Sequence, residues 1–225
     1  MAQTKKKRAS KSERHPLETY DPEQHAYILR CCDKDLRSHG GFQWPGQGLV
    51  EASNWNPKAE CGQGLHGWLW GEGDVSASGS THEDPESIWI VARVMKSEIV
   101  ELGGKVKFPR AWVEFVGTRE AAVDRMCELA GSGRAIIYST ATAGDLGTAT
   151  AGYAGTATAG IRGTATAGYA GTATAGYAGL VVIWWWDDAE ERCRLAVGYV
   201  GEDGIEPDVA YVVRDGKLAR KDGTP

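Results

Sequence analysis

Residues 140–179 read TATAGDLG, TATAGYAG, TATAGIRG, TATAGYAG, TATAGYAG, which is one octad repeated five times with its first five positions unchanged. A strict period indicates that each copy is one structural unit stacked on its neighbours. Thr-Ala-Thr-Ala alternates, so in a strand the threonines face one way and the alanines face the other. Gly-X-X-Gly indicates a turn, since glycine tolerates the left-handed backbone of a tight corner. The pattern predicts a flattened β-solenoid with two octads per coil, threonines outside and alanines inside.

The run Ala-Gly-Tyr-Ala-Gly-Thr-Ala-Thr-Ala-Gly begins at Ala151 and again at Ala167. It resembles the Ala-Gly-Tyr-Gly-Ser-Thr-x-Thr-Ala-Gly repeat of bacterial ice nucleation proteins. The resemblance implies a solenoid of similar coil length, with outward Thr-x-Thr rows that order water. The chain departs from the family in three ways: it lacks the Ser-Leu-Thr half-coil, its array is far shorter, and the membrane-associated N-terminal domain of that family is not recognisable.

Carried over by position, the resemblance implies a surface of outward threonines and corner tyrosines. Tyr153 and Tyr169 are expected to stack on one corner, with Tyr177 above Ile161 on the opposite corner. The expected binding surface comprises Thr148, Thr150, Thr156, Thr158, Thr164, Thr166, Thr172, Thr174, Tyr153, Tyr169 and Tyr177.

An array this short, with an alanine interior, needs caps. Each buried methyl contributes on the order of 0.8 kcal/mol, whereas ordering a residue costs about 1–2 kcal/mol of backbone entropy. Arg134–Tyr138 predicts a strand that enters the array, and Leu180–Ala219 predicts an antiparallel β unit that ends it, with a hairpin turn at Asp215-Gly216. A disordered Gly/Ala/Thr linker is the alternative for the repeats, although linkers do not keep so strict a register.

The segment before the repeats predicts an α+β domain. Strands are expected at Ala26–Cys32, Leu65–Trp70, Ser87–Val94, Glu98–Leu102, Val106–Phe108 and Trp112–Val116. A helix is expected at Arg119–Ala130, capped by Thr118 and ended by Gly131, whereas Gly71–Asp84 is expected to be a surface loop.

The whole chain is predicted to be mainly β with one helix. We expect a disordered basic tail over 1–19, the α+β domain over 20–133, the octad-repeat β-solenoid over 134–179 and a C-terminal β cap over 180–225. In that cap, Trp184, Trp185 and Trp186 cannot all face one way on a strand. The second face of that strand is therefore either covered as well, which we expect, or it binds something.

Composition narrows the compartment and the partners. The 225 residues carry a net charge of −5, although residues 1–19 are basic, so nucleic acid is expected to contact at most this tail. No apolar run follows the basic start or is long enough to span a membrane, which predicts a cytoplasmic protein without a membrane partner. Five cysteines, with Cys31 and Cys32 adjacent, favour a reducing compartment over a disulfide framework.

Two constellations in the α+β domain bear on chemistry. Cys31, His39, Cys61 and His66 are weak zinc ligands, because their spacing matches no common zinc module, and buried structural thiols are the expected alternative. Arg30, His66 and Glu114 loosely resemble the three-strand Arg/His, Tyr/His and Glu signature of ADP-ribosyltransferases. That resemblance implies an NAD-binding enzyme, whereas Glu114 also fits a solvent-facing position in an alternating strand.

The sequence favours a non-catalytic, repeat-bearing structural or binding protein without a cofactor. We expect it to act through contact with another protein or with a second copy of itself, including a homodimer. The ADP-ribosyltransferase-like enzyme is one alternative. The combination of segments also looks like a group of uncharacterised proteins in bacteria and their phages, so a phage-related inhibitor or decoy of a host protein is another.

Overall fold

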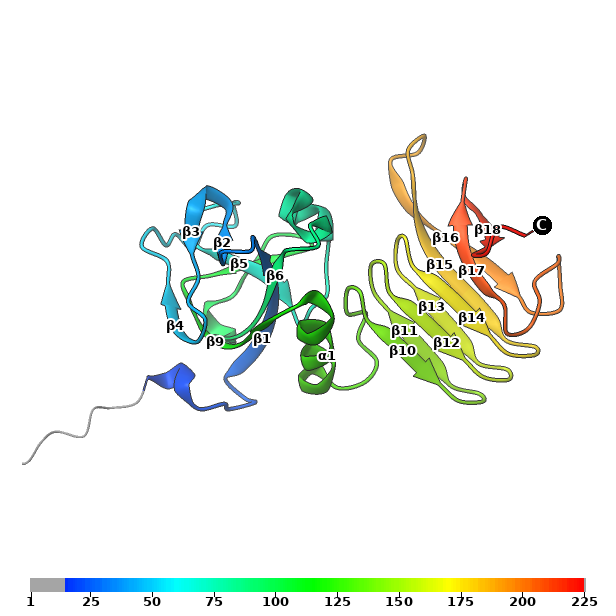
Figure 1. Cartoon of the computed structure of the whole chain (residues 1–225), viewed down its shortest axis with the longest axis horizontal. Helices are drawn as coiled ribbons and strands as arrows, with labels where there is room; N and C mark the ends of the chain where they lie inside the picture. The colour runs from blue at the N-terminus through cyan, green and yellow to red at the C-terminus, as the bar shows by residue number, and fades with distance from the viewer. Residues whose placement is uncertain (1–14, 225) are drawn as a thin grey trace, which may run out of the picture.

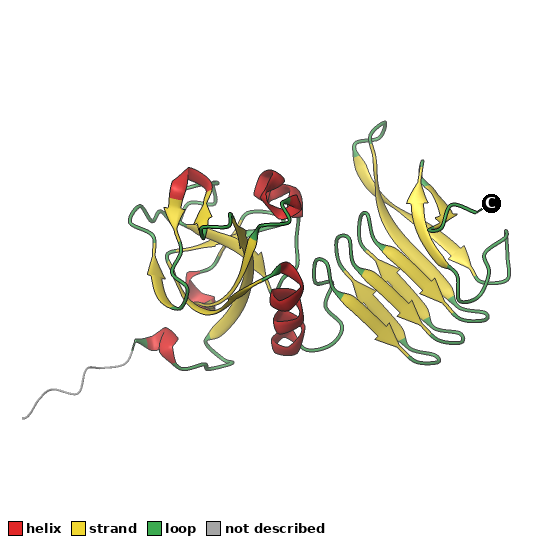
Figure 2. Ribbon diagram, viewed as in Figure 1, coloured by secondary structure: helices red, strands yellow, loops and turns green. Residues whose placement is uncertain are grey.

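A computed structural model describes residues 15–224. The chain forms two β-rich parts, with the helix α1 (Arg119–Ala130) lying between the N-terminal sheet and the repeats (Figures 1 and 2). The prediction of a mainly β chain with one α-helix is confirmed for the described residues. Within them, no helix is long and apolar enough to cross a membrane.

The N-terminal part is built on a seven-stranded antiparallel sheet with the order β4-β9-β6-β1-β5-β8-β7. Its strands are β1 (His25–Cys32), β4 (Gly48–Glu51), β5 (Leu65–Leu69), β6 (Ile88–Met95), β7 (Val100–Glu101), β8 (Val106–Phe108) and β9 (Arg110–Gly117). The sequence predicted all of these except β4, and it also missed the short pair β2 (Arg37–Ser38) and β3 (Phe42–Gln43).

Both faces of this sheet are buried. Ile28 packs with Phe108 on one face, and Leu29 packs on the other face with Met126 of α1. The helix begins and ends where the sequence predicts, because the Thr118 hydroxyl accepts a hydrogen bond from the Ala121 amide at 3.3 Å and Gly131 adopts a φ of 74°.

Short 3-10 helices correct two expectations. Residues Pro16–Glu18 form one of them and bury Leu17 completely, so the end of the predicted disordered tail is ordered; residues 1–14 of that tail lie outside the described residues. The expected surface loop before Pro85 contains 3-10 turns over Val75–Glu83, which Gly79 interrupts with a φ of 64° and whose first turn is capped by Asp74. The others are His39–Gly41 and Lys96–Glu98.

The octads coil as the alternation predicts. The strands β10 (Thr140–Ala143), β12 (Thr156–Ala159) and β14 (Thr172–Ala175) pair in parallel in a first repeat sheet. The strands β11 (Thr148–Ala151) and β13 (Thr164–Ala167) pair in parallel in a second repeat sheet. Paired residues are sixteen apart, as in Thr140↔Thr156, so each coil contains two octads, and the alanines of both sheets form one buried cluster.

The corners turn for a different reason from the one expected. The left-handed residue is the third of each Gly-X-X-Gly, with φ between 49° and 58°, and these residues are Leu146, Ala154, Arg162, Ala170 and Ala178. Glycine is needed instead where coils touch. A Cβ on Gly168 would lie 2.5 Å from the carbonyl carbon of Gly152 in the coil before it, so the small residue permits stacking rather than the turn.

The N-terminal domain itself supplies the first cap. The strand predicted at Arg134–Tyr138 is absent; Ile137 and Tyr138 form a turn instead. Tyr138 adopts a φ of 59° and donates from its amide to the Tyr153 carbonyl at 2.7 Å, so it takes the place of a left-handed corner residue. Ile137 donates to the Gly71 carbonyl at 2.9 Å, which ties this corner to the domain.

The C-terminal cap ends both repeat sheets. The strand β15 (Leu180–Asp187) extends the second sheet and pairs with β16 (Arg192–Tyr199), while β17 (Ala210–Arg214) and β18 (Lys217–Arg220) extend the first. The predicted Asp215-Gly216 hairpin is confirmed, with φ values of 49° and 74°. The expected coverage of both faces is wrong, because Trp184 and Trp186 are each 45% exposed on one face of β15. The β15–β16 hairpin projects beyond β13, which pairs with β15 only over Leu180–Ile183 (Figure 1).

Candidate functional site

The threonine rows lie on the outer faces of the two repeat sheets. The first face carries three rows and the second carries two, since β10, β12 and β14 alternate with β11 and β13. Adjacent rows are about 4.8 Å apart, and threonines within a row are roughly 6.6–7 Å apart. Thr172 does not fit the predicted surface, because β17 pairs beside β14 and Thr172 is only 7% exposed.

The two tyrosine corners differ in their surroundings. Tyr153 and Tyr169 stack as expected, with ring centroids 5.9 Å apart, and Tyr177 lies one coil after Ile161, since the Arg162 amide donates to the Tyr177 carbonyl at 2.9 Å. Tyr169 and Tyr177 are more than half exposed. Tyr153 is instead packed edge-on against Tyr138 and His82 of the N-terminal part, so it joins the two parts rather than offering a free anchor.

A third surface lies on the C-terminal cap, where the sequence left binding open as the alternative to coverage. We call it the ribbon face: it is the outer side of the β15–β16 hairpin, formed by Trp184, Trp186, Leu195, Val197 and Tyr199, each between 45% and 59% exposed. Strand β16 points its small residues inward, because Ala196 is buried and a Cβ on Gly198 would lie 2.5 Å from the Leu218 side chain. The larger residues of β16 are therefore left in solvent.

The N-terminal part contains a cavity of about 510 Å³, which we call the Arg30 cavity. Arg30 and Cys31 line it from β1, His66 and Trp68 line it from β5, and Arg37 and Lys105 line it from neighbouring segments. His39 and Cys61 line it as well, so all four residues considered for zinc face one space. The described residues nevertheless hold no group of three His, Cys, Asp or Glu side chains close enough to bind a metal.

His66 and the buried Cys31 of this cavity are not poised for nucleophilic chemistry. Burial, together with the charges of Lys105 and Arg30, lowers the pKa of His66 to about 4, so its ring is neutral at pH 7. Its Nε2 accepts a hydrogen bond from the Gly62 amide at 3.3 Å. Burial raises the pKa of Cys31, which keeps it a thiol rather than a thiolate.

Glu114 lies apart from Arg30 and His66. It is on β9, separated from β1 by β6, and its carboxylate pairs with the buried guanidinium of Arg93. Burial and then the Glu114 charge raise the pKa of nearby Tyr27 to about 12. The structure therefore brings Arg30 and His66 to one cavity but places the third residue of the transferase-like set in a separate ion pair.

Comparison with known proteins adds two findings. A family model described as a domain of unknown function (DUF7666) matches residues 26–123, the region of the seven-stranded sheet. Ice nucleation proteins match with 43% identity over 98 residues in Xanthomonas campestris pv. translucens, 41% over 103 residues in Pantoea ananas (InaU) and 42% over 99 residues in Pseudomonas syringae. The chain is similar to ice nucleation proteins.

The similarity covers 43–45% of this chain but only 6–10% of those three relatives. No solved structure matches the chain. The chain therefore spans at most about a tenth of the length of these ice nucleation proteins.

Proposed function

We propose that the protein is a non-catalytic binding protein that associates with a second copy of itself through the ribbon face. In this proposal the repeats are a rigid, flat scaffold, and the projecting β15–β16 hairpin carries the contact. The observation that carries the proposal is the exposure of five large apolar side chains on one side of one hairpin.

The size of the ribbon face supports a dimer. Side chains of this size, about half exposed, leave on the order of 500 Å² of apolar surface. Two such faces packed on one another bury roughly 1,000 Å², which reaches the lower bound for a specific interface. Leu180 and Val182 continue the face toward the threonine rows, since they pair with Thr164 and Thr166.

The shape of the surface also favours a second copy. A flat sheet face packs well on another flat sheet face at about 10 Å. A two-fold axis between two identical faces makes a closed and self-complementary contact. Trp184 and Leu195, which lie directly opposite each other on the hairpin, would form its centre, where large aromatic side chains contribute most.

Removing the centre of the ribbon face is expected to abolish association. Sedimentation or light-scattering mass at micromolar concentration should give a dimer for the unaltered chain and a monomer for Trp184→Ser with Leu195→Ser, because the dissociation constant rises at least about 100-fold. The matched control, Ile161→Ser with Tyr177→Ser, removes two exposed apolar side chains from a solenoid corner and should stay dimeric. A monomer for the unaltered chain, or equal masses for both variants, contradicts the proposal.

Ice nucleation by this chain is expected to be weak. A face with two or three threonine rows gives an ordered water patch far smaller than an efficient nucleus needs, even when a dimer doubles it. In droplet-freezing assays, the freezing temperature of solutions of this chain should therefore lie close to that of the buffer alone. It should also lie close to that of a Thr158→Lys with Thr174→Lys variant. Freezing at only a few degrees of supercooling, lost in that variant, would contradict this expectation.

A further inference from the structure

We propose that the Arg30 cavity binds a small organic anion that carries a phosphate or carboxylate group. This site is separate from the ribbon face, because it lies in the N-terminal sheet and its loops. Its volume of about 510 Å³ falls within the range of small-molecule sites.

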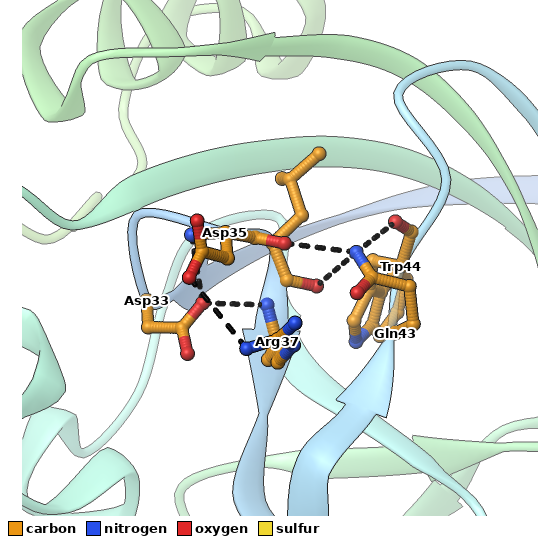
Figure 3. A network of polar contacts seen from close by, with 6 residues as sticks. Asp33, Asp35, Arg37, Gln43 and Trp44 are labelled. Carbon is orange, nitrogen blue, oxygen red and sulfur yellow. Dashed lines mark hydrogen bonds and ion pairs between the residues drawn. The ribbon is translucent and has the colours of Figure 1, made fainter.

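The charges around the cavity favour an anion. Arg30, Arg37 and Lys105 line it, although the whole chain has a net charge of −5. Among the described lining residues the acid is Asp33, so three cations face one carboxylate there. Arg37 also pairs with the Asp35 carboxylate at 3.6 Å, an exposed contact, which leaves Arg30 and Lys105 as the main cationic groups of the wall. Asp33 Oδ1 accepts hydrogen bonds from the amides of Arg37 at 2.7 Å and Asp35 at 2.9 Å (Figure 3).

The Arg30 guanidinium is held in place at the wall. Its Nη1 donates to the His66 carbonyl at 2.6 Å, and the group lies over the Trp44 ring at 5.3 Å from the centroid. Trp44 is itself fixed, because its indole nitrogen donates to the Ser38 hydroxyl at 3.2 Å. A planar guanidinium fixed in this way loses little freedom on binding an oxyanion and matches it with paired donors.

Arg30 also has donor capacity to spare. Its Nε is buried and has no hydrogen-bond partner among the described residues. A buried N–H left without an acceptor costs free energy, and an oxyanion that rearranges the guanidinium slightly could supply one. Burial and then these positive surroundings lower the pKa of His66 to about 4, so its imidazole is neutral at pH 7 and the charge that faces an anion comes from the Arg and Lys side chains.

The wall is not polar throughout, which favours an organic ligand over a bare inorganic ion. Cys31 and Trp68 are buried residues of the apolar core, and both line the cavity. Burial keeps the Cys31 thiol neutral by raising its pKa. The cavity thus pairs a cationic side with an apolar side, as sites for small organic anions do.

Calorimetric titration of the full chain tests this site with three probes: inorganic phosphate, citrate and adenosine monophosphate. We expect at least one organic probe to bind, with affinity reduced about tenfold or more in Arg30→Gln, as for loss of one charge-assisted contact. Arg37→Gln should weaken binding several-fold. If Arg30→Gln fails to fold, this second variant tests whether the cavity binds the anion. Arg214→Gln, on the exposed end of β17, is the matched control and should bind like the unaltered chain.

Which probe binds identifies the chemical source. Binding of adenosine monophosphate without citrate assigns a phosphate ester, and binding of citrate alone assigns a polycarboxylate. Failure of all three probes to bind overturns the inference, as does binding that survives both Arg30→Gln and Arg37→Gln unchanged. None of these outcomes bears on the mass measurements that test the ribbon face.

Discussion

Ala157→Asp is expected to unfold the repeats, whereas Thr158→Asp at the next position is expected to be tolerated. Ala157 is 0% exposed and sits among the alanine methyls between the two repeat sheets. An ionised carboxylate there finds neither water nor a partner cation, so the expected loss is more than about 4 kcal/mol. Thr158 points outward from the same strand and is partly exposed, so a carboxylate at that position stays hydrated.

Thermal unfolding followed by circular dichroism separates the two variants. The Tm of Ala157→Asp should fall by more than roughly 10 °C, and that of Thr158→Asp by no more than a few degrees. Equal losses, or a larger loss for Thr158→Asp, would mean that the alanines do not line the interior.

Gly168→Ala is expected to destabilise the coil, and Ala170→Gly in the same corner is not. A Cβ on Gly168 would come within 2.5 Å of the Gly152 carbonyl carbon and 2.7 Å of the Tyr153 amide nitrogen. Both are backbone atoms of the preceding coil, so they cannot rotate away, and the expected loss is about 2–3 kcal/mol.

The effect of Ala170→Gly on stability has the opposite sign, because the φ of Ala170 is 58°. Glycine removes the steric cost of this left-handed conformation, while it adds conformational freedom to the unfolded chain. The free energy of unfolding should therefore be unchanged or rise by up to about 1 kcal/mol. Denaturant titration of both variants measures the difference; stabilisation by Gly168→Ala or a large loss in Ala170→Gly would show that the corner is built differently.

The period of the octads carries enough information to predict their coil. Alternation in Thr-Ala-Thr-Ala sets which side chains face inward, and two octads per coil follow from the corners. The role of Gly168 was not predictable in this way, because it depends on a contact with Gly152 one coil away. The strand prediction for residues 134–138 was wrong for the same reason. Their local pattern favours a strand, but contacts to Gly71 and Tyr153 fold them into a corner.

The ribbon face and the Arg30 cavity were harder to predict from the sequence. In β16 the large residues alternate with Ala196 and Gly198, and such a pattern ordinarily places the large side chains in the core. The tight fit of Gly198 against Leu218 reverses that orientation. Arg30 and His66 were singled out from their strands, whereas Arg37 and Lys105 come from segments far apart in sequence, and no local pattern brings them together.

Hydrogen exchange at the repeat amides tests the central claim most directly. The amides of Ala149, Ala157 and Ala165 lie within parallel strands, and all three side chains are at most 2% exposed. If the octads form a capped solenoid, these amides should exchange slowly, over hours, together with the strands of the caps. Complete exchange within seconds in the native protein would show instead that the repeats are an unstructured linker.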